Sequence, residues 1–252
     1  MAIYITGDKH RDFTSVEMFC KRAGTTKDDL LIVLGDAGVN YTGDQEDQKF
    51  KKYLERMPIT FMFVRGNHEM RPSDLLYRKR FIFKREYCGS FLVEQDFPSL
   101  LFARSGEAYS LLDKDEHSIT AFVCGGAHSI DKDYRLKHGL RWFSDEQLSQ
   151  LERQYVLDNF KRSVFSARHN KKKIIVLTHT CPRSVVPQHA LMSGIDQSLE
   201  DWTMENFMND MMNELGDVPY TWYFGHFHVD EHNKIRENQL FRPMFNDFEM
   251  LR

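Results

Sequence analysis

The stretch IYITGDKH, residues 3–10, ends a strand-like run with the polar pair Asp8 and His10. Four later stretches repeat this arrangement, in which an apolar run leads directly into polar side chains. They are IVLGDAG at residues 32–38, FMFVRGNHE at 61–69, IIVLTH at 174–179 and TWYFGHFH at 221–228. In open α/β sheets, binding sites form at the carboxyl ends of the strands. We therefore expect the five polar clusters to meet at one place.

The periodicity of the rest of the chain predicts the fold class. Helix-like segments separate the first three strand-like runs, and this βαβαβ order implies a parallel sheet. Short strand-like pieces between residues 92 and 124 alternate with polar turns, as in antiparallel hairpins. We predict an α/β fold in which two packed mixed β-sheets form a sandwich flanked by helices. Because no linker or repeat interrupts the chain, we expect a single domain over residues 1–252.

The individual elements follow from the spacing of apolar residues. Strands are predicted at residues 2–6, 30–34, 59–64, 118–124, 174–178 and 220–224. Helices are predicted at residues 15–23, 45–57, 145–160 and 201–215.

Composition and charge argue against several classes of protein. The 41% of hydrophobic residues indicate a folded chain, and a net charge of −3 gives no general attraction to nucleic acid or to a membrane surface. No apolar run approaches the roughly 18 residues of a membrane span. The N-terminus lacks the pattern of a secretory signal. The isolated cysteines fit a reducing compartment, so we expect a cytoplasmic protein; they are Cys20, Cys88, Cys124 and Cys181.

The residue types in the five clusters suit divalent metal ions. Imidazole and carboxylate ligands without thiolate favour Mn, Fe or Zn over Ca. Residues two apart in a strand-like segment point to the same side, so His226 and His228 can aim two ligands at one place. Two carboxylates only partly neutralise two divalent ions, and the remaining positive charge suits a phosphate. The predicted ligands are Asp8, His10, Asp36, Asn67, His179, His226 and His228.

The ordered set GD-x-H, GD-x-G, GNHE, a lone histidine after a strand and GH-x-H resembles the calcineurin-like metallophosphoesterase superfamily. The resemblance implies two divalent ions and a sandwich of two sheets. It implies that one ion is held by Asp8, His10 and His228, the other by Asn67, His179 and His226, and that Asp36 bridges both. It also implies that a metal-bridging hydroxide attacks the phosphorus atom while His68, as general acid, protonates the leaving group.

One departure from that superfamily bears on the substrate. Its phosphoprotein phosphatases continue the second motif with Asp-Arg-Gly, whereas GDAGVNY at residues 35–41 lacks this element. The sequence is therefore not a close match to a protein phosphatase. Arg11 in GDKHR could replace the missing phosphate clamp, since a guanidinium matches two phosphate oxygens, or it could point to solvent.

Three more residues are candidates for substrate binding. Arg65 precedes GNHE and either orients phosphate or braces its loop. His128 and Arg135 lie in GGAHSIDKDYR, residues 125–135, which follows an apolar strand and could reach the substrate. The alternative for these two is a polar surface loop.

Three functions are compatible with these residues. The favoured one is hydrolysis of a small phosphomonoester or phosphodiester, without a membrane partner. A nuclease is less favoured: RKRFIFKR at residues 78–85 could contact a polynucleotide, but an amphipathic segment with Phe81 and Phe83 in the core explains it better. A non-catalytic scaffold is the third, and it is disfavoured because the ligands and His68 are all retained.

Overall fold

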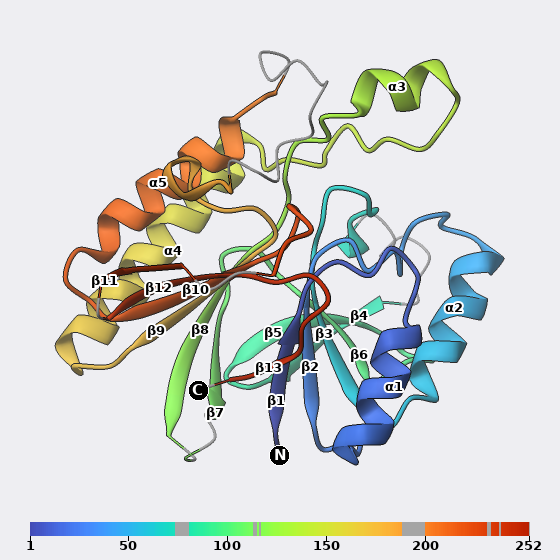
Figure 1. Cartoon of the computed structure of the whole chain (residues 1–252), viewed down its shortest axis with the longest axis horizontal. Coiled ribbons are helices and arrows are strands. Elements are labelled where there is room, and N and C mark those ends of the chain that lie inside the picture. The colour runs from blue at the N-terminus through green and yellow to red at the C-terminus, as the bar shows by residue number, and fades with distance from the viewer. Residues whose placement is uncertain are drawn as a thin grey trace.

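The computed structural model describes residues 1–73, 81–112, 115, 117–187, 200–230, 233–236 and 238–251. Two β-sheets pack face to face, and helices cover both outer faces (Figure 1). The predicted class, an α/β fold with two packed mixed sheets flanked by helices, is confirmed.

The first sheet is built around parallel strands from the N-terminal third of the chain. Among the described residues it has the strand order β13-β1-β2-β3-β6-β5-β4. The neighbours from β1 to β6 run parallel, and the strands at both edges are antiparallel. Its strands are β1 (Ile3–Thr6), β2 (Leu30–Leu34), β3 (Thr60–Val64), β4 (Phe81–Glu86), β5 (Gly89–Glu94), β6 (Leu100–Ala103) and β13 (Glu249–Met250). Its outer face is covered by α1 (Thr14–Ala23) and α2 (Gln45–Glu55).

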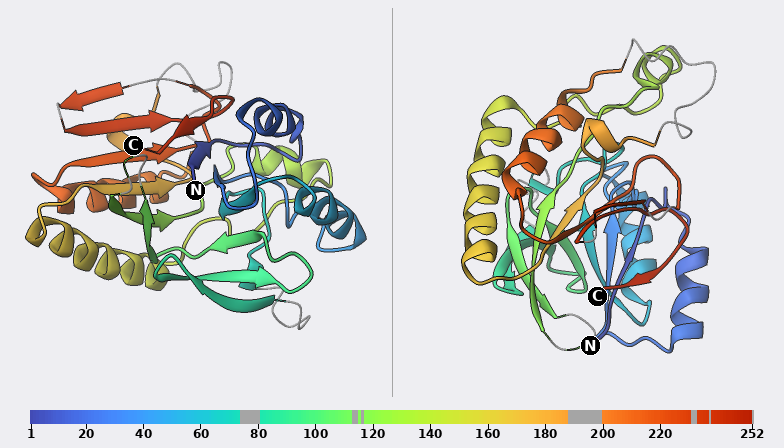
Figure 2. Two further views of the ribbon diagram at one scale, coloured as in Figure 1. Left: turned by 90° about the horizontal axis from the view of Figure 1, so that it is seen from below. Right: turned by 60° about the vertical axis from the view of Figure 1, so that its left-hand side comes forward.

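The second sheet has the order β11-β12-β10-β9-β8-β7 within the described part of the chain. Strands β12, β10, β9 and β8 run parallel to their neighbours, and β7 and β11 are antiparallel edges. Its strands are β7 (Ala108–Leu112), β8 (Ser118–Cys124), β9 (Ile174–Thr178), β10 (Tyr220–Phe224), β11 (Asn233–Arg236) and β12 (Gln239–Pro243). Its outer face is covered by α4 (Gln150–His169) and α5 (Thr203–Leu215), as Figure 2 shows. Two short helices, α3 (Lys132–Lys137) and η2 (Arg183–Val185), lie in loops.

Strand β2 shows why the central strands read as uninterrupted apolar runs. All five of its residues are buried. Leu30, Ile32 and Leu34 belong to the core between the sheets, whereas Leu31 and Val33 belong to the core beneath α1 and α2. A sheet that is covered on both faces needs apolar side chains on both, so the alternation of a half-exposed strand is absent.

The arrangement of the sheets places the polar clusters. Strands β1, β2 and β3 run parallel in the first sheet, and β9 and β10 run parallel in the second. Their carboxyl ends meet where the two sheets adjoin, since His179, directly after β9, places Nδ1 2.8 Å from the carbonyl oxygen of Leu34 at the end of β2.

Two sequence predictions need correction. The helix predicted at 145–160 begins at Gln150 and continues to His169, because Ser149 and Glu152 form a capping box that fixes its start. Phe83 is not in the core: it is 60% exposed on β4, an edge strand, and the Arg104 guanidinium lies over its ring. Phe81 is buried as expected, and residues 78–80 lie outside the described residues.

Within the described ranges, no helix combines the length and the apolar character that crossing a bilayer would require.

A buried ion pair ties α2 to the first sheet. Lys51 Nζ lies 2.7 Å from Glu94 Oε2 on β5, and both side chains are almost fully buried. The ammonium group also lies over the rings of Phe81 and Phe102. Gln48 Nε2 donates a hydrogen bond to the other carboxylate oxygen of Glu94. Because burying a charge is unfavourable without a partner, each member of the pair depends on the other.

We expect Lys51→Met to lower the free energy of unfolding by about 3–5 kcal/mol, because it takes the Lys51 ammonium group away from the buried Glu94 carboxylate. Urea denaturation measures the loss. The matched control is Lys49→Met on the same helix, which breaks an exposed ion pair with Glu46 and should cost less than about 1 kcal/mol. Equal losses in the two variants would contradict a special role for the buried pair.

Candidate metal centre

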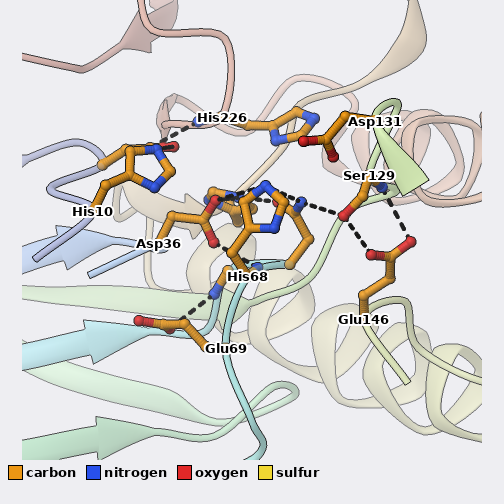
Figure 3. Close-up of polar contacts among 12 residues, drawn as sticks. His10, Asp36, His68, Glu69, Ser129, Asp131, Glu146 and His226 are labelled. Carbon is orange, nitrogen blue, oxygen red and sulfur yellow. Dashed lines mark hydrogen bonds and ion pairs between the residues drawn. The ribbon is translucent and has the colours of Figure 1, made fainter. Parts of the chain in front are cut away.

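The structure brings all seven predicted ligands together at the carboxyl ends of β1, β2, β3, β9 and β10. Figure 3 labels His10, Asp36 and His226 among them. Two groups of acidic and imidazole side chains each place their ligand atoms within 4.8 Å of one another. The first group is Asp8, His10 and His228, and the second is Asp8, Asp36 and His179. His226 joins them through its backbone N–H, which donates to Asp8 Oδ1 at 2.9 Å, and through its ring, 5.0 Å from that of His179.

The pair of His179 and Asn67 indicates where a cation fits. The Nδ1 atom of His179 faces the carbonyl oxygen of Leu34 at 2.8 Å, so Nδ1 carries the hydrogen and donates it. In the neutral ring, Nε2 then presents a lone pair to Asn67 Oδ1, which is 2.8 Å away and is also an acceptor. Two acceptors at this distance repel each other unless a cation or a proton lies between them. A metal ion satisfies both, and the Leu34 carbonyl then fixes the tautomer of the ligand.

The second concentration of ligand atoms surrounds Asp8. His228 Nε2 lies 3.2 Å from Asp8 Oδ2 and 3.0 Å from His10 Nε2. Contact with the carboxylate raises the pKa of His228 above its ordinary value. Asp8 is buried, whereas the side chains of His10 and His228 are about two-fifths exposed, at 43% and 41%. This donor set is therefore open to solvent on its histidine side.

Electrostatics at the centre favour an added positive charge. Burial raises the pKa of Asp8, but the imidazoles of His179 and His228 outweigh it and hold that pKa below its usual range. Burial, together with repulsion from Asp8, raises the pKa of Asp36 to about 8. Two buried carboxylates this close cannot both ionise at low cost without a compensating cation. Burial also lowers the pKa of His226, which keeps its ring neutral and able to act as a ligand.

The backbone at the ligands is strained. His10, Asp36, His226 and His228 have φ values of 42°, 45°, 66° and 53°, in the left-handed region that residues other than glycine rarely adopt. Strain of this kind costs on the order of 1–3 kcal/mol per residue and gathers at functional sites. Glycine makes the close packing possible: a Cβ atom at Gly66 would lie 1.9 Å from Asp36 Oδ1.

His68 lies beside this cluster. Its backbone N–H donates to Asp36 Oδ1 at 2.9 Å, and its Nε2 lies 3.9 Å from Asp36 Oδ2. Arg135 Nη2 approaches the same ring nitrogen at 3.3 Å. Burial and then the charge of Arg135 lower the pKa of His68 to about 3. The imidazolium form of His68 thus needs an additional negative charge nearby.

Two adjoining hollows give access to the centre. One has a volume of about 240 Å³ and the other about 220 Å³, and both are lined by His10, Asp36, His68 and Arg135. The larger continues past Ser129 to Trp202 and Glu205.

The four predicted substrate-binding residues differ in placement. Arg135 lines both hollows and is held by Asp131, whose carboxylate accepts from its Nε at 2.8 Å. Arg11 lines the smaller hollow, but its guanidinium already donates to Asp47 Oδ1 at 2.7 Å and lies over the ring of Phe50. Of the four, Arg135 is therefore the one whose guanidinium is best placed to meet a phosphate.

Arg65 and His128 have their polar groups engaged by the protein. Arg65 Nη2 donates to the carbonyl oxygen of Glu146 at 2.9 Å, an arrangement that braces the loop after β3. His128 Nδ1 lies 2.9 Å from Glu200 Oε1, and this contact raises the pKa of the ring. Neither residue lines the two hollows described above.

The sequence did not predict two residues that support the predicted ligand Asn67, one directly and one through the other. Ser129 Oγ accepts a hydrogen bond from Asn67 Nδ2 at 2.8 Å, and Glu146 contacts Ser129 in turn. Both lie in polar loops, where a serine or a glutamate carries no pattern that separates it from its neighbours. The only signal was the position of Ser129 in the loop that follows β8.

Comparison with known proteins adds the family. The sequence profile of the calcineurin-like phosphoesterase family matches residues 1–230. No curated protein matches the chain significantly. The structure of TT1561 from Thermus thermophilus is similar with a TM-score of 0.51 and 11% identity, over 99% of this chain and 97% of that one.

A dimetal phosphatase from Danio rerio is similar with a TM-score of 0.50 and 10% identity, over 96% of this chain and 86% of that one. At such low identity the structural likeness concerns the fold. The family profile, however, spans most of the chain and all five polar clusters. The chain therefore belongs to the calcineurin-like phosphoesterase family.

Proposed function

We propose that this chain is a dinuclear metal-dependent hydrolase of a small phosphomonoester or phosphodiester, acting as one domain. One observation supports this proposal most. His179 Nε2 and Asn67 Oδ1 lie 2.8 Å apart, and in the neutral ring each presents a lone pair to the other. Family membership supports metal-dependent phosphoester chemistry. The absence of thiolate among the clustered ligands suits Mn, Fe or Zn.

The ligands divide into two sets. Asp8, His10 and His228 would hold one ion, Asn67, His179 and His226 the other, with Asp36 between them. When bound, the two ions would activate a water molecule and neutralise charge on the phosphoryl oxygens. The buried carboxylates orient the imidazoles, and the exposed sides of His10 and His228 leave room for the substrate.

His68 is proposed to protonate the leaving group. It lines both hollows, and Arg135 lies 3.3 Å from its Nε2. A phosphate bound between these two side chains brings the negative charge that offsets burial and the guanidinium, which raises the pKa of His68. Protonation of the acid is in this way coupled to substrate binding.

The alternative functions receive less support. In the first sheet, β4 is separated from β3 by β6 and β5, so the described part of the basic and aromatic segment does not adjoin the ligands. A scaffold without activity would not need His68 beside Asp36. We also propose a cytoplasmic location, in keeping with four unpaired cysteines.

Removal and return of metal tests the proposal directly. Chelator-treated protein should lose turnover of p-nitrophenyl phosphate and of bis-p-nitrophenyl phosphate, and Mn²⁺ should restore one or both. Asp36→Asn should lose turnover and bind metal more weakly, because it removes the charge that lies between the two ligand sets. Elemental analysis measures bound metal. If wild-type protein with two bound ions hydrolyses neither substrate nor a wider panel of phosphoesters, the enzymatic proposal is wrong.

We expect His68→Ala to retain both ions and to lower kcat for an alkyl phosphate by a factor of about 10²–10⁴. The loss should be much smaller for p-nitrophenyl phosphate, whose leaving group departs without a proton. Exposed His169→Ala at the end of α4 is the control and should leave both rates unchanged. Equal effects on the two substrates would exclude the general-acid role.

Arg135→Ala should raise KM by about ten- to a hundredfold, since a charged hydrogen bond to phosphate is lost. Removing the cation also raises the pKa of His68. The imidazolium therefore persists to higher pH, and the alkaline fall of kcat for an alkyl phosphate should move upward. Steady-state kinetics across pH measures both effects. An unchanged KM would show that Arg135 does not contact the substrate.

A further inference from the structure

A buried serine and a buried glutamate lie next to Asn67, and the serine also lines the larger of the two hollows. Ser129 and Glu146 are each only 2% exposed. Ser129 follows β8 and Glu146 precedes α4, and Figure 3 shows Ser129 between Glu146 and the ring of His68. Neither side chain has a part in the chemistry proposed above. Burial of an acid is costly unless the acid is well hydrogen-bonded, so its partners indicate its role.

The hydrogen bonds in this group have a defined direction. Glu146 accepts the backbone N–H of Ser129 on Oε1 at 3.0 Å and the hydroxyl of Ser129 on Oε2 at 2.5 Å. A serine hydroxyl has a single hydrogen, and here it is donated to the carboxylate. Only lone pairs of Ser129 Oγ remain to face Asn67, which lies 2.8 Å away. The atom that Asn67 presents to Ser129 must therefore be its donor, Nδ2.

The orientation of the Asn67 amide follows from this. An amide carries its oxygen and its nitrogen on opposite sides, so fixing Nδ2 on Ser129 points Oδ1 at His179 Nε2. We propose that Ser129 and Glu146 are positioning residues, which hold the Asn67 oxygen toward the ion that Asn67, His179 and His226 would share. This inference rests on the proposed two-metal site. It adds two residues that determine how tightly the second of the two sites binds its ion.

The backbone around Glu146 is fixed independently. Arg65 Nη2 donates to the Glu146 carbonyl oxygen, and the Glu146 N–H donates to the carbonyl oxygen of Phe143 at 3.0 Å. Arg65 is two residues from Asn67, so one side chain connects the ligand's own loop to the glutamate that orients it. Arg65 thus supports the positioning pair through the backbone of Glu146.

The test is a titration of metal-free, full-length protein with Mn²⁺, followed by calorimetry and without any substrate. Ser129→Ala should weaken one of two sites by about 10–100-fold and leave the other within about twofold. Glu146→Gln should act in the same direction, because its new amide can donate to Ser129 Oγ and free the hydroxyl hydrogen to face Asn67. This second variant keeps the test available if the first does not fold.

Ser90→Ala is the matched control. Ser90 likewise lies between a nitrogen donor and a glutamate, since Arg104 Nη1 donates to Ser90 Oγ at 2.9 Å and Ser90 Oγ donates to Glu107 Oε1 at 3.1 Å. It contacts no predicted ligand, so both affinities should stay unchanged. If Ser90→Ala weakens metal binding as much as Ser129→Ala does, the effect is one of general stability and the inference fails.

A double-variant cycle distinguishes orientation from packing. In Asn67→Asp both terminal atoms of the side chain are oxygens, so either orientation of the carboxylate presents an oxygen to the metal. We expect Ser129→Ala to change metal affinity by less than about twofold in the Asn67→Asp protein, against the 10–100-fold loss in the wild-type background. Losses of equal size in both backgrounds would overturn the inference.

The remaining outcomes separate this inference from the proposed function. Two ions bound by wild-type protein, with unchanged affinities in Ser129→Ala and Glu146→Gln, would overturn only the role of the positioning pair. Fewer than two ions bound by the wild-type protein would overturn the second metal site and this inference together. A lack of phosphoester turnover with the expected metal affinities would leave the inference standing and count against the enzymatic proposal.

Discussion

The central constraint on this structure is that lone pairs and negative charges lie close together where β1, β2, β3, β9 and β10 end. Asp8 and Asp36 are buried close together, and His179 Nε2 lies 2.8 Å from Asn67 Oδ1. Bulk water solvates these four side chains poorly, because each of them is at most 2% exposed. Protons relieve the repulsion in part, as the pKa of about 8 for Asp36 indicates. Divalent cations would relieve it fully, so the protein surface at this point is preorganised for them.

Such a site needs a scaffold that tolerates unfavourable local geometry. Several of the clustered residues have left-handed backbone conformations, and glycines admit contacts that any side chain would block. The neighbouring strands compensate, since every residue of β2, β9 and β10 is buried, and at most one residue of β1 and of β3 is partly exposed. The two sheets meet along an apolar core that includes Ile32 and Leu177. Stability is thus concentrated directly beneath the polar edge, where it holds the strained loops in place.

Much of this arrangement was predictable, for a physical reason. The bounds of β2, β8, β9 and β10 agree with the predicted strands. Every residue of β2, β9 and β10 is buried and most are apolar, and β8 ends in the buried apolar run at residues 121–124. The ligands were found because each directly follows such a run. The prediction that Phe83 lies in the core was wrong, because β4 is an edge strand and Phe83 lies on its exposed face. Ser129 and Glu146 were missed because their role depends on Asn67, 62 residues before Ser129, and no local spacing records that contact.

The hydrogen bond from His179 to the Leu34 carbonyl also bears on how the molecule assembles. It joins the two sheets through residues 145 positions apart in the chain. Loops of the first sheet supply Asp8, Asp36 and Asn67, and loops of the second supply His179, His226 and His228. An ion bound by ligands from both sheets would therefore link the two sheets. Such a link cannot form until β9 and β10 have docked against the first sheet. The site is therefore complete only when the two sheets of the sandwich are docked in the correct register.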